Sequence, residues 1–456
     1  MDPAIFKAYD IRGIYEEQFD EDDAWKIGNS AARFLPSLLS GFERGQPTSQ
    51  TLCVGHDMRT HSQALAAKLI EGIRCAGVNV IDLGMIDTPQ IYFAINHLNT
   101  CGGIQVTASH NPAKYNGFKI SGVHATPIGA DTGLLDIKHL AVALIHTKGN
   151  PTGSLKEMDL TEAYKEHVLR FLTPKLRKLK IAIDASNGMA GKMIPLIFGD
   201  RPIEISKLNF KHDGKFKHPP DPLIEKNQSE LKTAVIKRKC DFGLCFDGDA
   251  DRLIMVDESG QTIGCDLMTA WLVSYFLKRN PKSTVVYDLR SSRVVPEEII
   301  KNEGTPRRER VGHAYLKKAM RDSRAIFGGE LSGHFYYRDN FCADSGLITL
   351  VHILNRVSES DEPVSEMIKP LRRYARSGEL NFQVEDKPIK MEELGRLYHE
   401  GKEDRLDGVT IDFKDWWFNC RPSNTEPFLR LNIEAKTQTV LDERVKEIQA
   451  LLGKPV

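Results

Sequence analysis

The sequence predicts an α/β protein of several domains, with a smaller α+β domain at its C-terminal end. Two observations support this fold class. The chain has 456 residues, more than one hydrophobic core usually organises, since a domain takes roughly 100 to 150 residues. Short apolar runs rich in β-forming residues alternate with amphipathic segments, which indicates βαβ units and mixed or parallel sheets. We therefore expect about three or four domains.

The alternation can be followed along the chain. In the first third, a strand, a helix and a strand are expected at 51–57, 62–77 and 78–84. The second third repeats the pattern at 179–188 and 189–199, and then holds an acidic loop between two strands in 242–263. A third α/β block runs over 284–292, 310–323 and 324–335. The tail has strands in 408–420 and 428–435 before a helix from about Val440 to Leu452, so it reads as α+β.

Domain boundaries are expected where glycine, proline and charged residues concentrate. Such stretches occur near 146–154, around Asp257 and near 359–370. They divide the chain into four predicted domains, residues 1–152, 153–256, 257–368 and 369–456.

Composition excludes several classes of partner. The 62 basic and 62 acidic residues give a formal net charge of zero, so no global field attracts the chain to nucleic acid or to an anionic membrane. The 8 cysteines form no CxxC pair, and the N-terminal stretch has no signal-peptide pattern. No apolar run reaches the roughly 18 residues of a membrane span. We expect a reduced, cytoplasmic protein.

The acidic loop "FDGDADR" predicts a metal site. Asp247, Asp249 and Asp251 alternate, so an extended loop places all three carboxylates on one side. Carboxylates with open coordination positions suit Mg²⁺ bridging to a phosphate better than a closed Ca²⁺ cage, and the EF-hand pattern does not match. Arg252 would lie beside the same anion. The alternative is an acidic surface turn, which the apolar strand before the loop disfavours.

Two further loops carry polar side chains that suit a sugar phosphate. In "GGELSGH", Glu330, Ser332 and His334 alternate and would offer an acceptor, a hydroxyl and an imidazole to sugar hydroxyls. A tight turn with a satisfied histidine explains that stretch about as well. In "NCRPSNTEPFLR", a guanidinium and short polar side chains fit a phosphate nest, with an ordinary Asx or Ser turn as the alternative. The nest residues are Arg421, Ser423, Asn424 and Thr425.

The stretch "VTASHNPAKYNGFKI" raises three readings of Ser109: a nucleophile, a phosphate carrier or a structural polar residue. An Asn-Gly turn could bring Lys119 back toward Ser109. A serine hydrolase would need His110 as base, but adjacent side chains usually point apart and no GxSxG elbow exists. Near the N-terminus and in "GHDMRTHS", Arg12 and Arg59 stand next to acids, and either could be an ordinary ion pair.

Taken in order, "TASHNP", "DGDADR", "GGELSGH" and "RPSNTEP" resemble the four signature loops of the α-D-phosphohexomutases, with "YDIRG" near the start as a fifth element. The resemblance covers nearly the whole chain, and it is strongest to the bacterial phosphomannomutases and dual phosphomannomutase/phosphoglucomutases. It implies a fold of four domains around a central cleft: three related α/β domains with mixed sheets and a smaller α+β C-terminal domain.

The resemblance also implies roles for residues of this chain. Ser109 corresponds to the phosphoserine and a metal ligand, together with Asp247, Asp249 and Asp251. Arg12, Lys119, Arg252 and His110 fall at the reacting phosphate, with Lys119 expected as the general base and acid. The positions that match substrate contacts are Tyr9, Arg290, His313, Glu330, Ser332, His334, Arg421, Ser423, Asn424, Thr425 and Arg430. Arg290 stands where some members carry a sugar-contacting lysine, so their sugar preference does not transfer.

Charge supports a metal-dependent reading. A phosphoserine carries about −1.5 to −2 charges, and three aspartates would add to them. At an effective dielectric constant near 20, like charges about 5 Å apart cost on the order of 3 kcal/mol per pair, so the cluster requires a cation. We expect Mg²⁺, a hexose phosphate substrate and a hexose 1,6-bisphosphate that acts as intermediate and activator, in a monomer or homodimer without nucleic acid or membrane partners.

Alternatives of other kinds stay open. "LCFDGDAD" also resembles the strand and DxD motif of aspartyl-phosphate phosphatases, in which Asp247 would be the nucleophile. A phosphoglucosamine mutase is an alternative within the family, because mannose, favoured here, is not fixed against glucose or glucosamine. A catalytically silent sugar-phosphate-binding protein is the third alternative, and the intact Ser109 and aspartates argue against it.

Overall fold

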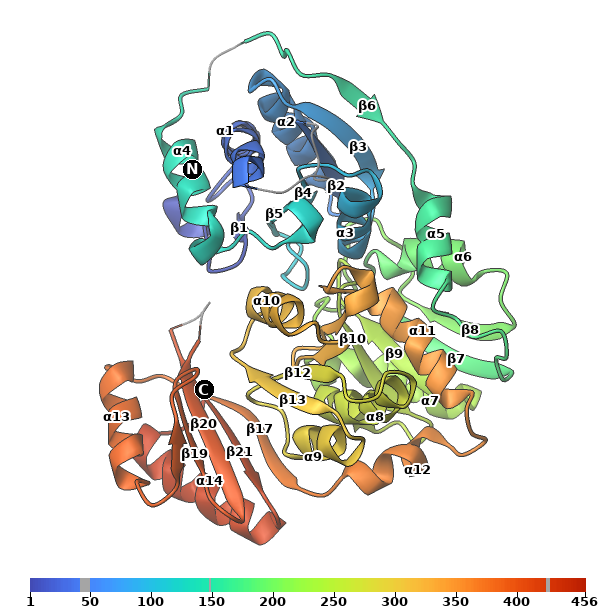
Figure 1. Ribbon diagram of the computed structural model, residues 1–456, viewed down its shortest axis with the longest axis vertical. Coiled ribbons are helices and arrows are strands. Elements are labelled where there is room, and N and C mark those ends of the chain that lie inside the picture. The colour runs from blue at the N-terminus through green and yellow to red at the C-terminus, as the bar shows by residue number, and fades with distance from the viewer. Residues whose placement is uncertain (42–49, 147–148, 424–426) are drawn as a thin grey trace. The chain divides into compact units, whose positions relative to one another are not determined.

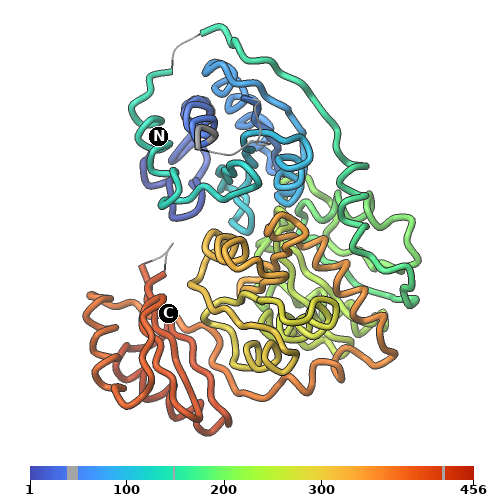
Figure 2. The backbone as a smooth tube through the Cα atoms, in the orientation of Figure 1, coloured from blue at the N-terminus to red at the C-terminus, as the bar shows by residue number. Residues whose placement is uncertain are grey.

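The computed structural model describes residues 1–41, 50–146, 149–423 and 427–456. The chain forms two compact units, one of Met1–Cys265 with Ser332–Ser365 and the other of Asp266–Leu331 with Glu366–Val456. Figures 1 and 2 let the reader follow the chain through both. Each unit combines mixed or antiparallel sheets with covering helices, which confirms the expected α/β class. The three predicted boundaries between the four domains stay a prediction.

The first unit opens with a six-stranded mixed sheet. Its strands are β1 (Ile11–Ile14), β2 (Thr51–His56), β3 (Asn79–Met85), β4 (Gly102–Val106), β5 (Tyr115–Gly122) and β6 (Leu155–Glu157). They lie in the order β1-β5-β4-β2-β3-β6. β2 is parallel to β3 and β4, whereas β5 is antiparallel to β1 and β4. The carboxyl ends of β2 and β4 therefore meet at one edge, where the loops with Asp57 and Ser109 begin.

Helices cover this sheet. They are α1 (Glu21–Phe34), α2 (Ser62–Cys75), α3 (Thr88–His97) and α4 (Leu134–Ala143). α1 and α2 approach closely because each has a glycine at the contact: a Cβ on Gly28 would lie 2.2 Å from the Leu69 carbonyl oxygen, and one on Gly72 would lie 2.0 Å from that of Trp25. Asn29 Nδ2 also donates to the Gly72 carbonyl at 3.0 Å. The domain core beneath is apolar and fully buried.

A second sheet of five strands follows in the same unit. Its strands are β7 (Leu179–Asp184), β8 (Ile203–Leu208), β9 (Phe242–Phe246), β10 (Leu253–Asp257) and β11 (Thr262–Ile263). β7 is parallel to β8 and β9, and β10 is antiparallel to β9 and β11. The accompanying helices are α5 (Thr161–Leu169), α6 (Ala190–Phe198) and α7 (Ser229–Arg238). The acidic loop lies between β9 and β10, as predicted. A β15 (Phe335–Tyr337) and β16 (Ala343–Asp344) pair and α11 (Gly346–Val357) complete the unit.

The second unit holds the third α/β block. β12 (Thr284–Asp288) is parallel to both β13 (Thr305–Glu309) and β14 (Phe327–Gly329). α8 (Cys265–Arg279), α9 (Val294–Lys301) and α10 (His313–Ser323) alternate with these strands. The short α12 (Val364–Ile368) leads toward the C-terminal part.

The C-terminal part is an antiparallel sheet with two helices. Its strands are β17 (Ala375–Phe382), β18 (Lys402–Asp404), β19 (Val409–Asp412), β20 (Trp416–Pro422) and β21 (Leu429–Ala435), in the order β17-β21-β20-β19-β18. α13 (Lys387–Leu397) contacts β19 and β20, and α14 (Gln438–Leu452) contacts β17 and β21. The helix expected from Val440 is α14, which starts two residues earlier because Thr437 caps it by accepting from Val440 N–H.

No helix in the described part of the chain combines the length and the apolar character that crossing a bilayer would need.

Candidate active site

Ser109 lies in the loop that joins β4 to β5. Its φ of +47° is in the left-handed region that serine seldom adopts, and the residue is fully buried. The Ser109 hydroxyl Oγ donates a hydrogen bond to Asp247 Oδ2 at 2.8 Å. Ser109 and Asp247, 138 positions apart, therefore meet in one unit.

The three aspartates form one buried cluster. Asp247, Asp249 and Asp251 each offer a carboxylate oxygen, and these atoms lie within 4.8 Å of one another. Gly248 permits the loop contact: a Cβ there would lie 2.4 Å from the Ser109 carbonyl oxygen. The oxygens Asp249 Oδ1 and Asp251 Oδ1 are buried without a hydrogen-bond donor. Such oxygens, close together and lacking donors, fit a divalent cation.

Two cations face the aspartates. Lys119 Nζ, from β5, lies 2.7 Å from Asp249 Oδ2 and 2.6 Å from Asp251 Oδ2. Arg252 Nε lies 3.7 Å from Asp247 Oδ2. The Asn-Gly turn expected at 116–117 to return Lys119 toward Ser109 is instead part of the strand β5, whose antiparallel pairing with β4 places the lysine at the site.

Burial and the neighbouring charges shift the pKa values of this cluster in opposite directions. Burial, followed by Asp251 and Asp249, raises the pKa of Asp247 well above its ordinary value. Burial also opposes ionisation of Asp251, but Lys119 and His334 outweigh it and hold its pKa well below the usual range. For Lys119, burial disfavours the ammonium form, while Asp249 and Asp251 raise its pKa. The strong shift at Asp247 marks where a bound cation would relieve repulsion.

The side chain of His110 lies closer to that of Ser109 than we expected for adjacent residues. Its Nδ1 lies 3.3 Å from Ser109 Oγ, so the expectation that these neighbours point apart was wrong, because the left-handed backbone of Ser109 turns the two side chains to the same side. Burial, with Arg252 and Arg12 next, lowers the pKa of His110 well below its ordinary value. The ring is therefore neutral. The GxSxG elbow of a serine hydrolase is still absent around Ser109.

Other predicted residues of the first unit lie around this cluster. Arg12 Nη1 donates to Asn111 Oδ1 at 2.6 Å, and Arg12 is paired with Asp10. Arg252 Nε donates to His334 Nε2 at 3.1 Å. His334 Nδ1 lies 2.8 Å from the Ser332 hydroxyl. Arginine, histidine and serine therefore form one hydrogen-bonded row beside the aspartates.

A second cluster is built in the other unit, around Glu379. Arg421 Nη2 and Arg430 Nη1 each lie 3.0 Å from a Glu379 oxygen, and Arg290 Nη1 lies 3.3 Å away. Arg290 also lies 3.6 Å from Glu330. Arg421 is 1% exposed, and its Nε has no hydrogen-bond acceptor. A buried guanidinium with a donor to spare suits a phosphate.

The remaining predicted residues are placed as follows. Ser423 is half-buried at the end of β20, whereas Asn424 and Thr425 lie outside the described residues. Tyr9, before β1, and His313, the first residue of α10, are half-buried. Glu330 lies in the second unit, while Ser332 and His334 belong to the first. The single polar face expected for these three residues stays a prediction.

Sequence reasoning missed several residues at these sites. The Thr88 hydroxyl donates to Asp249 Oδ2 at 2.5 Å, and Asp344 Oδ2 lies 3.7 Å from His334 Nε2. Glu379 joins the three arginines. Thr88 follows β3 at the start of a helix, a position where ligand-binding residues gather in α/β proteins, and this was the one available signal. No pattern in the sequence pointed to Asp344 or Glu379.

Models of one family match nearly the whole chain. The phosphoglucomutase/phosphomannomutase alpha/beta/alpha domains I, II and III match residues 3–139, 162–260 and 265–374, and the C-terminal domain of that family matches residues 379–451. The chain belongs to the phosphoglucomutase/phosphomannomutase family. It is a hexose phosphate mutase, an isomerase that moves a phosphoryl group.

Relatives of this mutase match it over nearly the full length of both chains. The phosphomannomutases of Vibrio cholerae serotype O1 and Escherichia coli K12 are each 37% identical to it, over 98% of both chains. The phosphomannomutase of Methanocaldococcus jannaschii is 37% identical over 99% of this chain and 98% of its own. A crystal structure of a phosphoglucomutase/phosphomannomutase family protein from Burkholderia thailandensis superposes with a TM-score of 0.89 at 29% identity, covering 100% and 99% of the two chains.

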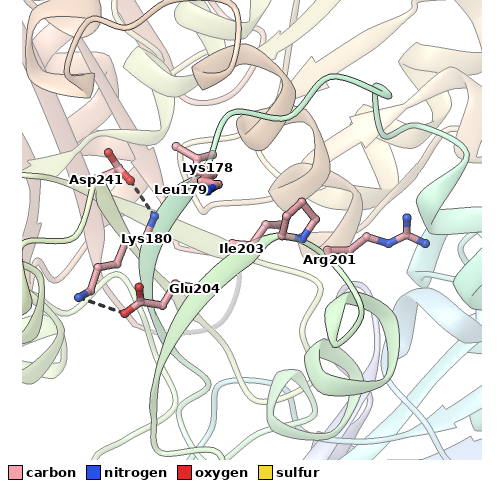
Figure 3. Close-up of a pocket in the computed structure, with 8 residues that line it drawn as sticks. Lys178, Leu179, Lys180, Arg201, Ile203, Glu204 and Asp241 are labelled. Carbon is pink, nitrogen blue, oxygen red and sulfur yellow. Dashed lines mark hydrogen bonds and ion pairs between the residues drawn. The ribbon is translucent and has the colours of Figure 1, made fainter.

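A shallow pocket of about 470 Å³ lies elsewhere in the mutase, at the amino ends of β7 and β8 (Figure 3). Lys180 pairs with Glu204 at 3.0 Å there, and its N–H donates to Asp241. Ligands of α/β sheets bind at the carboxyl ends of the strands, where Asp247 follows β9. The pocket therefore lies at the opposite edge of this sheet from the aspartate cluster.

Proposed function

We propose that this mutase interconverts hexose 6-phosphate and hexose 1-phosphate through a phosphorylated Ser109, with mannose as the favoured sugar. The observation that carries the proposal is the 2.8 Å contact between Ser109 Oγ and Asp247 inside a buried cluster of three carboxylates. The full-length similarity to phosphomannomutases supports the sugar preference. Phosphoglucomutase activity is expected beside it.

Two half-reactions account for the isomerisation. In the first, the Oγ–P bond of phospho-Ser109 breaks while a hexose hydroxyl oxygen forms a bond to the same phosphorus; the hydroxyl proton passes to a base, and Ser109 Oγ takes up a proton. The product is a hexose 1,6-bisphosphate. In the second, Ser109 Oγ gives up its proton and bonds to the phosphorus of the other phosphate, and the sugar oxygen that leaves takes up a proton. Catalytic amounts of bisphosphate should therefore activate enzyme that has lost its phosphate.

Asp247, Asp249 and Asp251 would hold Mg²⁺ together with the serine. Such an ion supplies charge stabilisation to a loose phosphoryl-transfer transition state. The donor set fits, because Asp249 Oδ1 and Asp251 Oδ1 are buried without a hydrogen-bond donor, and because the charges of Asp251 and Asp249 add to burial in raising the pKa of Asp247. The protein's part is to keep these buried carboxylates close together.

Lys119 is proposed as the group that donates and accepts the proton. Its raised pKa beside Asp249 and Asp251 makes it an ammonium ion at neutral pH, ready to act as the acid. Acting as the base requires the neutral amine, which arises once the proton has been given away. Arg12 and Arg252 are proposed to balance the charge of the reacting phosphate.

The arginine cluster around Glu379 is proposed to anchor the phosphate that does not react. It comprises Arg290, Arg421 and Arg430, and Ser423, Asn424 and Thr425 lie between Arg421 and Arg430 in the sequence. The residues proposed to contact the sugar are Tyr9, His313, Glu330, Ser332 and His334. One anchor must accept either end of the bisphosphate, since only Ser109 transfers phosphate.

The chemical stability of the enzyme-bound phosphate tests the carrier. Enzyme labelled with a ³²P-hexose bisphosphate should keep its label in mild alkali, because a phosphoserine is stable there and an acyl phosphate is not. Loss of label in alkali would favour an aspartyl-phosphate at Asp247 and a phosphatase. Initial rates with mannose, glucose and glucosamine 1-phosphates would decide between the favoured sugar and a phosphoglucosamine mutase.

A further inference from the structure

Ser109 has a backbone conformation that a serine seldom adopts. Its φ of +47° places a side-chain-bearing residue in the left-handed region, which costs on the order of 1 kcal/mol and persists only where surrounding contacts hold it. The same conformation aims Oγ at Asp247. Contacts that hold the Ser109 peptide groups therefore also determine where the reacting oxygen lies.

The N–H side of Ser109 is held by a threonine. Ser109 N–H donates to Thr107 Oγ1 at 2.9 Å, and that hydroxyl donates its own proton to Asp57 Oδ2 at 2.7 Å. All three residues are buried. Because Asp57 fixes the direction of the threonine hydroxyl, a lone pair of Thr107 points at the serine N–H.

The carbonyl side is held by Arg59. Its Nε donates to Asp57 Oδ2 at 3.2 Å, and Nη2 donates to the Ser109 carbonyl oxygen at 2.8 Å. The other three donors also go to main-chain oxygens of the loop, those of Asn111, Pro112 and Tyr115, at 2.6, 2.8 and 3.0 Å. A guanidinium has five N–H donors, and all five of Arg59 are used.

Arg59 therefore has no N–H donor available for a substrate phosphate. Its side chain is 0% exposed, and the ring of Phe216 lies 5.1 Å from its guanidinium carbon. This separates Arg59 from Arg12 and Arg252, which line the reacting cluster. The ordinary ion pair that the sequence allowed does exist with Asp57. Most of the guanidinium N–H groups, however, donate to main-chain oxygens.

We propose that Asp57, Arg59 and Thr107 are positioning residues for phosphoryl transfer: they hold both peptide groups of Ser109 and so keep its Oγ in line for the reaction. This inference rests on the proposed role of Ser109 as the phosphoryl carrier. A displacement of a reacting atom by about 1 Å can cost roughly a hundredfold in rate. The substrate anchors are other residues, so the effect belongs in kcat and not in KM.

Two substitutions of Thr107 separate its hydroxyl from its shape. Thr107→Val keeps the branched shape and leaves the buried Ser109 N–H without an acceptor, whereas Thr107→Ser keeps the hydroxyl. In full-length enzyme activated with hexose 1,6-bisphosphate and assayed with mannose 1-phosphate, we expect Thr107→Val to lower kcat by about 10- to 100-fold with KM within about twofold. Thr107→Ser should stay within about threefold of the parent.

Controls separate positioning from general destabilisation. Ile73→Val removes one buried methyl group from α2, outside the loop, and should lower the melting temperature without lowering kcat. Asp57→Asn, which cannot accept the Thr107 proton through its amide nitrogen, should reproduce the kcat loss and serves if Thr107→Val does not fold. Phosphate on Ser109, measured by intact mass, is the second readout.

The outcomes are distinct. A kcat loss confined to Thr107→Val and Asp57→Asn, with Ser109 phosphorylated in the parent, supports the inference. Turnover of Thr107→Val within twofold of the parent, or an equal loss in Ile73→Val, overturns it and leaves the phosphoserine mechanism standing. A parent that never carries phosphate on Ser109 overturns the proposed function instead, and the positioning role with it.

Discussion

At the scale of single residues, this mutase places unfavourable groups where its chemistry is proposed to occur. Ser109 has a left-handed backbone, and Asp247 has a strongly raised pKa. Neither arrangement stabilises the fold by itself. Perturbed ionisable groups and strained backbone are typical of catalytic sites, where neighbouring contacts maintain them.

Removing the serine hydroxyl tests the carrier. Ser109→Ala should lower mutase turnover by at least about a thousandfold, equivalent to roughly 4 kcal/mol of transition-state stabilisation. The melting temperature should change little, because the alanine loses only the contacts of Oγ with Asp247 and His110. The matched control is Ser229→Ala, an exposed serine on α7, which should turn over normally. Near-normal turnover of Ser109→Ala would reject the covalent mechanism.

Asp87 gives a prediction about pH. Burial raises its pKa to about 8, although Tyr164 and the N–H of Gln90 donate to it. A carboxyl whose folded pKa is raised binds its proton more tightly when folded. Its favourable contribution is therefore complete below the unfolded pKa and is lost as pH rises toward 8.

Asp87→Asn should cancel this loss, since asparagine is neutral and still caps α3. We expect the melting temperature of the variant to exceed that of the parent by about 2 °C or more at pH 8.5, and the advantage to vanish near pH 4. Calorimetry across that range is the measurement. An advantage that is independent of pH would mean that Asp87 is not the titrating group.

At the scale of elements, β-structure brings the site residues into register. The β4–β5 pairing delivers Lys119 to the loop with Ser109, and the β9–β10 pairing holds the aspartates. In the C-terminal sheet, β17 shifts register between Arg376 and Glu379. Bulges of this kind re-aim side chains near sites, and here the shifted strand brings Glu379 to the arginines of β20 and β21.

Arg421 on β20 should act as a shared phosphate anchor. Losing a buried, charge-assisted contact costs about 1.5 to 3 kcal/mol or more, so Arg421→Ala should raise the Michaelis constants for both the 1-phosphate and the 6-phosphate by roughly 10- to 150-fold. Their ratio should hardly move. A penalty in one reaction direction alone would show that the two orientations use different anchors.

Glu379 should compete with that anchor. It lies 3.0 Å from the Arg421 and Arg430 nitrogens, so its charge both occupies their donors and repels an arriving phosphate. Glu379→Gln should therefore tighten inhibition by inorganic phosphate at least about threefold. Glu392→Gln, an exposed acid paired with Arg405, is the control. Weaker inhibition in Glu379→Gln would show instead that the carboxylate is needed to hold the arginines in place.

At the scale of the whole molecule, each unit gathers charges of both signs in one cluster. The aspartates meet Lys119 and Arg252 in the first unit, and Glu379 meets three arginines in the second. The net charge of zero thus conceals one site with acidic excess and one with basic excess. The first suits a cation and the second a phosphate.

Chelation should separate catalysis from folding. With EDTA, turnover should be abolished while the melting temperature shifts by only a few degrees, because Lys119 and Arg252 pair with the aspartates and offset part of their charge. Added Mg²⁺ should restore activity. Asp249→Asn should behave like permanent chelation. A large fall in melting temperature without loss of turnover would indicate a structural ion.

The fold class, the order of the elements and the four motif loops could be read from the sequence, because strand and helix periodicity, turns and loop composition are local properties. The acidic loop between β9 and β10 and the helix near Val440 are examples. The aspartates could be predicted as a group for the same reason, since they alternate within one loop.

Which distant residues meet was decided only by the tertiary structure. Glu379 and Asp344 carry no local signal, and Arg59 looks like an ordinary ion pair in sequence because its four main-chain acceptors lie 50 to 56 positions away. The side-chain direction of His110 depended on one backbone angle at Ser109. Side-chain contacts across long sequence separations follow from sheet pairing and loop closure, which a local pattern of residues does not encode.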